Sequence, residues 1–192
     1  MKDIMTMRDC KFKVCSTNIK LAVFDFDGTL AIHKDKDYLA HRKERGKNNY
    51  YRKAFENPDT FYETIEPCDI SSDMYHLICY LRLHNVKMYC LSGMKMSLHF
   101  AAKQSFINKH YGNDIELLSV STQEGKVDVV KILQQTLNCK SEEILFVDDL
   151  QVVVDLMKEQ GYMPHCLVQC SLVRFQFIHV CHIKMEHILN AY

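Results

Sequence analysis

Two pairs of aspartates follow short apolar runs in this chain of 192 residues. Asp25 and Asp27 end the stretch LAVFDFD, and Asp148 and Asp149 end the stretch ILFVDD. An apolar run of this length is typical of a buried strand, and open α/β sheets bind their ligands at the carboxyl ends of such strands. Carboxylates held side by side repel one another unless a cation or a shared proton separates them. The pattern therefore predicts a divalent metal bound by oxygen ligands at the edge of a sheet.

Other polar residues near these acids could belong to the same site or have only structural roles. Ser92 follows an apolar run and, taken alone, would be a turn residue. Lys126 opens a helical pattern, where a cation opposes the helix dipole, and this misfit favours a functional role. Asp149 could cap the helix that follows it, and the first acidic pair could be only an acidic turn. The second acidic pair argues against that last interpretation.

Hydrophobic periodicity predicts strands that alternate with helices after the first apolar run. The expected strands are 21–24, 86–91, 115–120, 144–147 and 163–168, and the expected helices begin near 71, 95, 126 and 150. This alternation indicates right-handed βαβ crossovers and a parallel sheet that is covered on both faces. The predicted fold class is therefore α/β.

Composition sets limits on partners and location. The 24 basic and 24 acidic side chains cancel, so no overall field favours nucleic acid or an anionic membrane. No apolar run has the length of a membrane span or the form of a signal peptide. The nine cysteines include no CxxC pair, which favours reduced, mostly buried thiols over a zinc site. These features predict a cytoplasmic protein with no membrane partner.

Four motifs, in order and with suitable spacing, resemble those of the haloacid dehalogenase-like (HAD) hydrolases, which are mostly phosphatases. They are DFDGTL at 25–30, Leu91-Ser92-Gly93, Lys126 and Asp148-Asp149, and the resemblance covers about 20–168. It implies a Rossmann-like, doubly wound sheet of five parallel strands in the order 5-4-1-2-3. In that order the first and fourth strands are neighbours at a topological switch point, so both acidic pairs share one crevice.

The resemblance also implies roles for these residues. Asp25 would be the nucleophile that forms an aspartyl-phosphate, and Asp27 would protonate the leaving group and later activate water. Aspartate at position 27, where the family's ion-pumping ATPases carry threonine, favours hydrolysis over a stored phosphoenzyme. Asp25, Asp27 (through its backbone carbonyl), Asp148 and Asp149 would hold Mg²⁺. The implied phosphate-binding residues are Gly28, Thr29, Ser92, Gly93 and Lys126, of which Ser92 and Lys126 are also counted as catalytic.

The domain organisation follows from the same comparison. Residues 1–30 and 67–170 would form the catalytic core, and 31–66 a small helical cap inserted after the first strand. The apolar residues 171–192 would be a C-terminal extension packed on the core or on a partner. A basic, aromatic stretch at 41–53 could hold an anionic substrate or a polynucleotide end, or be a solvated helix face. Neighbouring acids nearly cancel its charge, so nucleic-acid binding is possible but not favoured.

Response-regulator receivers, which also use aspartates and a lysine on a parallel sheet, place a phosphorylated Asp after the third strand. Here the third expected strand ends Ser119-Val120-Ser121, without an acid, which excludes that class.

Three functions remain from the sequence. The leading one is a Mg²⁺-dependent phosphohydrolase acting on a small phosphorylated metabolite, such as a nucleotide or a sugar phosphate. The second is a phosphatase acting on a nucleic-acid end or a phosphoprotein. The third is a catalytically silent binding protein with this fold, against which the four intact acids argue.

Overall fold

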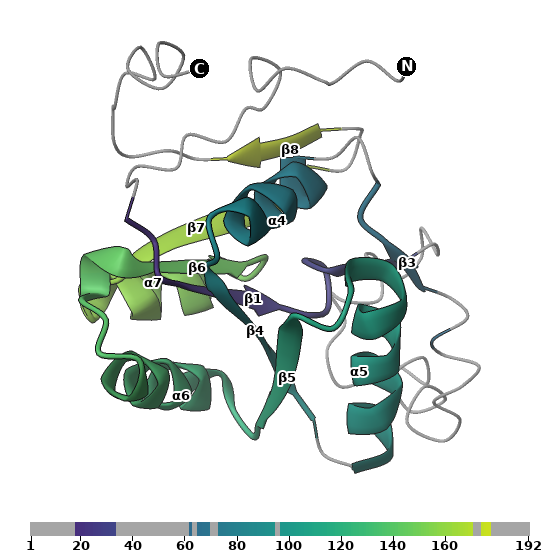
Figure 1. Cartoon of the computed structure of the whole chain (residues 1–192). Helices are drawn as coiled ribbons and strands as arrows, with labels where there is room; N and C mark the ends of the chain where they lie inside the picture. The colour runs from purple at the N-terminus through teal and green to yellow at the C-terminus, as the bar shows by residue number, and fades with distance from the viewer. Residues whose placement is uncertain are drawn as a thin grey trace, which may run out of the picture.

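A six-stranded sheet forms the centre of the structure, a computed structural model that describes residues 18–33, 62, 65–69, 73–94, 97–170 and 174–177. The strands lie in the order β5-β4-β1-β6-β7-β8 (Figure 1). Neighbouring strands from β5 to β7 are parallel, whereas β8 is antiparallel to β7. The strands are β1 (Leu21–Asp25), β4 (Lys87–Gly93), β5 (Ile115–Val120), β6 (Ile144–Asp148), β7 (Met163–Cys170) and β8 (Arg174–Phe177). The predicted α/β class with a parallel sheet is confirmed.

Within the described residues, two helices cover each face of the sheet (Figure 1). Alternate residues of β1 point to opposite faces, as the pleat requires. Ala22 and Phe24 pack in the cluster that includes α4 and α5, while Leu21 and Val23 pack in the cluster that includes α6 and α7. The helices are α4 (Asp73–Leu83), α5 (Ser97–Tyr111), α6 (Gln123–Thr136) and α7 (Gln151–Glu159), and the short 3₁₀ helix η2 (Ser141–Glu143) precedes β6.

Strands β1 and β6 are buried along their whole length. Because helices cover both faces, these strands read as continuous apolar runs rather than as alternating ones. Phe24 is in register with Val147, and Asp25 is in register with Leu91 of β4. This register brings the carboxyl ends of the three central strands to one edge of the sheet.

A second, two-stranded sheet lies where the predicted insertion begins and ends. Its strands, β2 (Ala31–His33) and β3 (Ile65–Pro67), are antiparallel. Three-residue strands are too short to give a periodic signal, so the sequence did not predict them. Of the helical cap predicted at 31–66, residues 34–61 and 63–64, including the basic stretch at 41–53, lie outside the described residues.

The sheet also differs from the expected five parallel strands. Strand β8 adds a sixth, antiparallel strand inside the predicted C-terminal extension 171–192. Pairing with β8 covers part of the edge that β7 would otherwise expose. The segment RFQF alternates polar and apolar residues, which is typical of a strand, although no strand was predicted there. The rest of the extension, 171–173 and 178–192, lies outside the described residues.

Helix α6 begins before Lys126, at Gln123, and not at Lys126 as expected from the sequence. Thr122 is its N-cap and accepts a hydrogen bond from the amide of Gly125 at 3.1 Å. Lys126 therefore lies at the end of the first helical turn, with the rest of α6 behind it. In the described part of the chain, no helix combines the length and the apolar character needed to cross a bilayer.

Candidate active site

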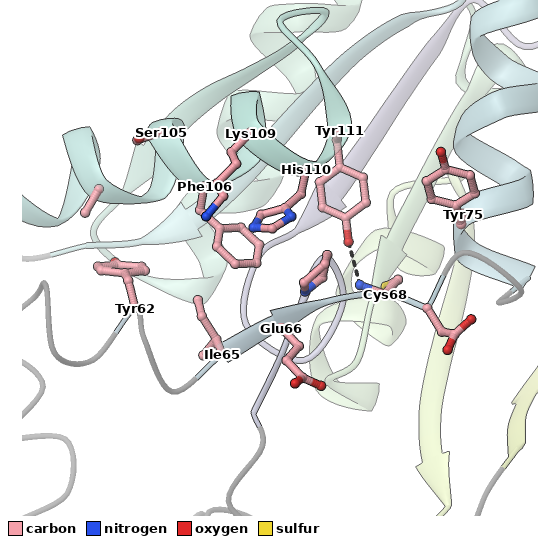
Figure 2. A pocket seen from close by; sticks show the side chains of 13 residues that line it. Tyr62, Ile65, Glu66, Cys68, Tyr75, Ser105, Phe106, Lys109, His110 and Tyr111 are labelled. Carbon is pink, nitrogen blue, oxygen red and sulfur yellow. Dashed lines mark hydrogen bonds between the residues drawn. The ribbon is translucent and has the colours of Figure 1, made fainter.

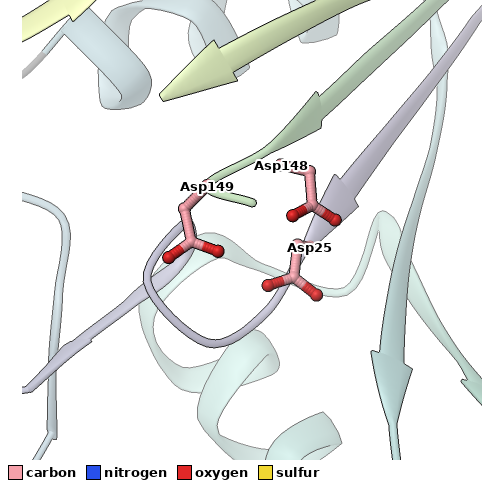
Figure 3. Close-up of side chains that lie close together, drawn as sticks. All are labelled: Asp25, Asp148 and Asp149. Carbon is pink, nitrogen blue, oxygen red and sulfur yellow. The ribbon is translucent and has the colours of Figure 1, made fainter. Parts of the chain in front are cut away.

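Three carboxylates meet at the edge of the sheet where β1 and β6 end (Figure 3). Each of Asp25, Asp148 and Asp149 offers an oxygen atom, and these atoms all lie within 4.8 Å of one another. Asp25 is 7% exposed, Asp148 is fully buried and Asp149 is half-buried. The parallel pairing of β1 with β6 accounts for this convergence, since both strands deliver an acid at the same end.

Lys126 reaches this cluster from α6. Its Nζ donates a hydrogen bond to Oδ1 of Asp25 at 2.7 Å and another to Oδ2 of Asp148 at 2.6 Å. Only 1% of the residue is exposed, so it is not the solvated lysine that usually occupies a first helical turn. One ammonium group against three carboxylates leaves two negative charges in excess. A divalent cation would balance them.

The ionisation of the cluster is strongly perturbed. Burial raises the pKa of Asp25 to about 7; the charge of Lys126 opposes this rise, and the carboxylates of Asp148 and Asp149 add to it. Burial also raises the pKa of Asp148. Burial alone would lower the pKa of Lys126, but the carboxylates of Asp25 and Asp148 hold it above its usual value. The lysine therefore stays charged, while the acids need a further cation to be ionised together.

Asp27 lies beside this cluster of three carboxylates, in the turn that follows β1. Gly28 adopts φ +88°, a conformation that suits glycine, and its amide donates to the carbonyl oxygen of Ala31 at 2.8 Å. The Gly28 amide is therefore engaged within the turn. Thr29 is fully buried, and its carbonyl oxygen accepts a hydrogen bond from Sγ of Cys68 at 3.0 Å. Gly28 thus helps to hold the shape of the turn, and Thr29 connects the turn to Cys68, which follows β3.

Lys103 is a partner of Asp27 that none of the sequence motifs indicated. Its Nζ donates to Oδ2 of Asp27 at 2.6 Å and to Oγ of Ser92 at 2.7 Å. Only 4% of Lys103 and none of Ser92 is exposed. The ammonium group also lies 4.5 Å from the centroid of the Phe26 ring, in cation–π geometry. Gly93, the last residue of β4, is exposed and is in register with Val120.

A sequence signal for Lys103 did exist. His99, Lys103 and Phe106 are spaced as neighbours on one face of α5, and all three are buried. A lysine on the apolar side of a helix needs a partner for its charge. The amphipathic pattern of this helix is weak, so hydrophobic periodicity did not identify its buried face.

Two further side chains lie next to Asp27 and Lys103. The hydroxyl of Tyr62 is 3.3 Å from Nδ1 of His99. Burial, and next the charge of Lys103, lower the pKa of His99. Burial and the charge of Asp27 raise the pKa of Tyr62. A second polar cluster, defined here as Asp27, Ser92, Lys103, His99 and Tyr62, therefore lies beside the cluster of three carboxylates.

A pocket of about 860 Å³ lies close to this second cluster, between β3 and α5 (Figure 2). Tyr62 and Phe106 line it, and both rings pack edge-on against Phe26, with centroids 6.4 and 5.6 Å away. Because Phe26 stands between Asp25 and Asp27 in the chain, the pocket wall adjoins the acidic turn. Lys109 and His110 bring basic groups to the pocket, and Glu66 and Asp69 bring acidic ones.

Comparisons with known proteins bear on the fold of this chain. No protein-family model and no curated protein matches the sequence. A haloacid dehalogenase-like family hydrolase from Streptococcus pneumoniae is 14% identical, with a TM-score of 0.51 over 78% of this chain and 84% of the other. A putative haloacid dehalogenase-like hydrolase from Bacteroides fragilis is 14% identical, with a TM-score of 0.50 over 76% and 86% of the two chains.

A third solved structure is the N-terminal part of another Bacteroides fragilis protein, which contains a phosphatase domain and is complexed with Mg. It is 14% identical, with a TM-score of 0.50 over 79% of this chain and 36% of the other. At this level of identity the three comparisons show a shared fold. The chain has the haloacid dehalogenase-like fold that its four motifs predicted.

Proposed function

We propose that this protein is a Mg²⁺-dependent phosphohydrolase that cleaves phosphomonoesters through an aspartyl-phosphate at Asp25. The observation that carries the proposal is the buried cluster of Asp25, Asp148 and Asp149 with Lys126 at the carboxyl edge of the sheet. Such a cluster is costly to bury without a task for its charge. Ligands bind at this edge in doubly wound sheets.

The donor set suits Mg²⁺. Carboxylate oxygens are hard ligands, and the described residues bring no thiol or imidazole into this cluster. Asp25, Asp148 and Asp149 would hold the ion, and the carbonyl oxygen of Asp27 is a further proposed ligand. A similar fold has been solved with Mg bound. The ion would supply positive charge that lets an anionic nucleophile approach an anionic phosphate.

The reaction assigns separate tasks to Asp25 and Asp27. A carboxylate oxygen of Asp25 attacks phosphorus, and the bond from phosphorus to the leaving oxygen breaks while Asp27 gives that oxygen a proton. Asp27 then takes a proton from a water molecule, whose oxygen attacks the phosphorus of the aspartyl-phosphate. Inorganic phosphate leaves and the Asp25 carboxylate is restored. The Asp27 side chain is 34% exposed, so both a leaving group and water can reach it.

Lys126 and Ser92 would position the reacting groups. The two hydrogen bonds of Lys126 fix the carboxylates of Asp25 and Asp148 relative to each other. Its charge lies where the transition state gathers negative charge. The hydroxyl of Ser92 would donate a hydrogen bond to a non-bridging phosphate oxygen. Gly93, at the exposed end of the same strand, would leave room for that phosphate, since a Cβ there would meet nothing within 4 Å.

The proposed substrate is a small phosphorylated metabolite. The pocket of about 860 Å³ has the size of a small-molecule site. None of the proposed catalytic or metal-holding residues lines it, but its Tyr62 and Phe106 rings pack on Phe26 of the acidic turn. These two rings would suit a planar leaving group. This substrate class covers nucleotides and sugar phosphates.

Release of inorganic phosphate from a panel of small phosphomonoesters tests the proposal. Wild type should release phosphate only with Mg²⁺, and Asp25→Asn should abolish release because an amide is a poor nucleophile. The matched control is Asp155→Asn, an exposed acid on α7, which should behave as wild type. Equal turnover by wild type and Asp25→Asn would contradict the mechanism. No release by wild type from any substrate would favour the binding protein of the same fold.

A further inference from the structure

We infer that Lys103 is a second phosphate-binding cation, which contacts a non-bridging oxygen of the substrate together with Ser92. The inference rests on the proposed function and adds to it a residue outside the four motifs. Its ammonium group lies between Asp27, the proposed acid, and Ser92, the proposed phosphate ligand, at 2.6 and 2.7 Å. Lys103 comes from α5, on the opposite face of the sheet from Lys126.

The hydrogen bonds of this group leave capacity for a ligand. An ammonium group has three N–H donors. Asp27 and Ser92 take two, and the Phe26 ring, whose centroid lies 4.5 Å from the ammonium group, is a weaker partner for the third than a phosphate oxygen would be. The Ser92 oxygen accepts from Lys103, so the hydroxyl proton of Ser92 remains available to another acceptor. Two donors therefore converge beside the acidic turn, where the phosphate would bind.

A purely structural role does not account for the charge of Lys103. Burying an ammonium group is costly even when it is paired, and the neighbouring positions on the buried face of α5 are filled by Phe106 and Ile107. Asp27 retains contact with solvent through a third of its side chain, so water can hydrogen-bond its carboxyl group without a buried cation. The cost is explained if the ammonium group serves a ligand.

The formal charges of the site favour the same role. With Asp27 protonated, as the proposed acid must be when substrate binds, three carboxylates and two ammonium groups leave one negative charge in excess. One Mg²⁺ makes the total +1, so a phosphate dianion would enter a site of opposite charge. Without Lys103, the same site with Mg²⁺ is neutral and attracts the dianion less.

Binding of inorganic phosphate, the expected product, tests this role without chemistry. Isothermal titration calorimetry would measure its Kd with the full chain in Mg²⁺ for wild type, Lys103→Met, Lys103→Gln and Lys103→Arg. Lys131→Met, an exposed lysine on α6, is the control for charge. Loss of one charge-assisted hydrogen bond should weaken phosphate binding roughly 10- to 100-fold in the Met and Gln variants. Lys103→Arg should keep most of the affinity, and Lys131→Met all of it.

The same substitution in an Asp27→Asn background separates contact from positioning. If Lys103 touches phosphate, Lys103→Met should weaken phosphate binding in that background as well. Loss of its effect there would overturn the inference, because Lys103 would then act only through Asp27. If wild type turns over a phosphomonoester but Lys103→Met binds phosphate as tightly as wild type, only the inference is overturned. If wild type shows no turnover and does not bind phosphate, the proposed function and the inference are both overturned.

Discussion

The Nζ atom of Lys126 lies 2.6 Å from Oδ2 of Asp148 at a place where neither residue has appreciable contact with solvent. The same ammonium group binds Asp25, so one cation holds two strand ends together. A pair of this kind adds little net stability compared with apolar packing, but removing one partner is costly because the other charge is left buried. Lys126 thus stabilises the arrangement of the two acids in addition to its proposed catalytic role.

Lys126→Met should therefore lower the free energy of unfolding of the metal-free protein by about 3–5 kcal/mol near pH 8. Mg²⁺ should recover part of this loss, because it would neutralise the same carboxylates. Urea unfolding with EDTA and with Mg²⁺ measures both effects. Lys131→Met, exposed on the same helix, should change the free energy of unfolding by no more than about 0.5 kcal/mol. A loss of stability that Mg²⁺ leaves unchanged would contradict a shared site for lysine and metal.

The pH dependence of stability should reveal the buried carboxyl of Asp25. Its pKa rises from the ordinary 3.8 to about 7 in the folded protein. Between these values the folded state binds a proton that the unfolded state has lost, so this residue makes the free energy of unfolding fall as pH rises. The slope from one such group is at most about 1.4 kcal/mol per pH unit. Below the unfolded pKa the effect vanishes.

The measurement is a comparison of wild type and Asp25→Asn by urea unfolding in EDTA at several pH values between 5 and 8. The amide cannot titrate, so the variant should gain stability relative to wild type as pH rises. Mg²⁺ should stabilise wild type more at pH 8 than at pH 5, because protons compete with the ion for the carboxylates. Parallel curves for the two proteins in EDTA would show that Asp25 ionises normally.

The sequence predicted the elements that bear the acids because their physics is local. Continuous apolar runs such as LAVF and ILFV can only be satisfied by burial on both faces. Their acids then emerge at strand ends, and the structure brings Asp25, Asp148 and Asp149 together. Lys126 was expected to open its helix, but α6 begins earlier, at Gln123, and the ammonium group of Lys126 hydrogen-bonds to Asp25 and Asp148.

The rest of the site depends on tertiary contacts that no local pattern encodes. Lys103 is 76 positions from Asp27 and meets it only because α5 packs on the sheet beside the acidic turn. The inward turn at Gly28 and Thr29 depends on backbone hydrogen bonds to Phe26 and Ala31. Strand β8 needs the edge of β7 as a template. Each of these features is set by a partner distant in sequence or by turn geometry rather than by hydrophobic period.

Tyr111→Phe should weaken the link between the acidic turn and the second sheet. The buried hydroxyl donates to the carbonyl oxygen of Leu30 at 2.6 Å and accepts from the amide of Cys68 at 2.8 Å. Removing it leaves two buried backbone groups without this hydrogen-bond partner, at a cost of about 1–3 kcal/mol each. Urea unfolding should show a loss of about 2 kcal/mol or more. Tyr80→Phe, half-buried on α4, is the control and should stay within about 0.5 kcal/mol of wild type. A similar small effect at Tyr111 would mean that water replaces the hydroxyl.

Two glycine substitutions should have opposite effects on stability, because space and backbone conformation differ at the two positions. Gly125 lies within α6, and an added Cβ would meet Oγ1 of Thr122 at 3.5 Å and Cβ of Val120 at 3.8 Å, which are ordinary contacts. Alanine in a helix is favoured over glycine by about 0.8–1.0 kcal/mol, so Gly125→Ala should stabilise the fold and leave the proposed turnover unchanged.

Gly161 has open space around it but a φ of +79°. A left-handed conformation costs a residue with a Cβ about 1–2 kcal/mol, so Gly161→Ala should destabilise the fold even though nothing would clash with the new methyl group. Thermal unfolding of both variants in EDTA provides the comparison. A lower Tm for Gly125→Ala would mean that the added methyl group strains the first turn of α6 and displaces Lys126. A gain at position 125 with a loss at 161 would show that backbone conformation, and not free volume, sets the tolerance of these glycines.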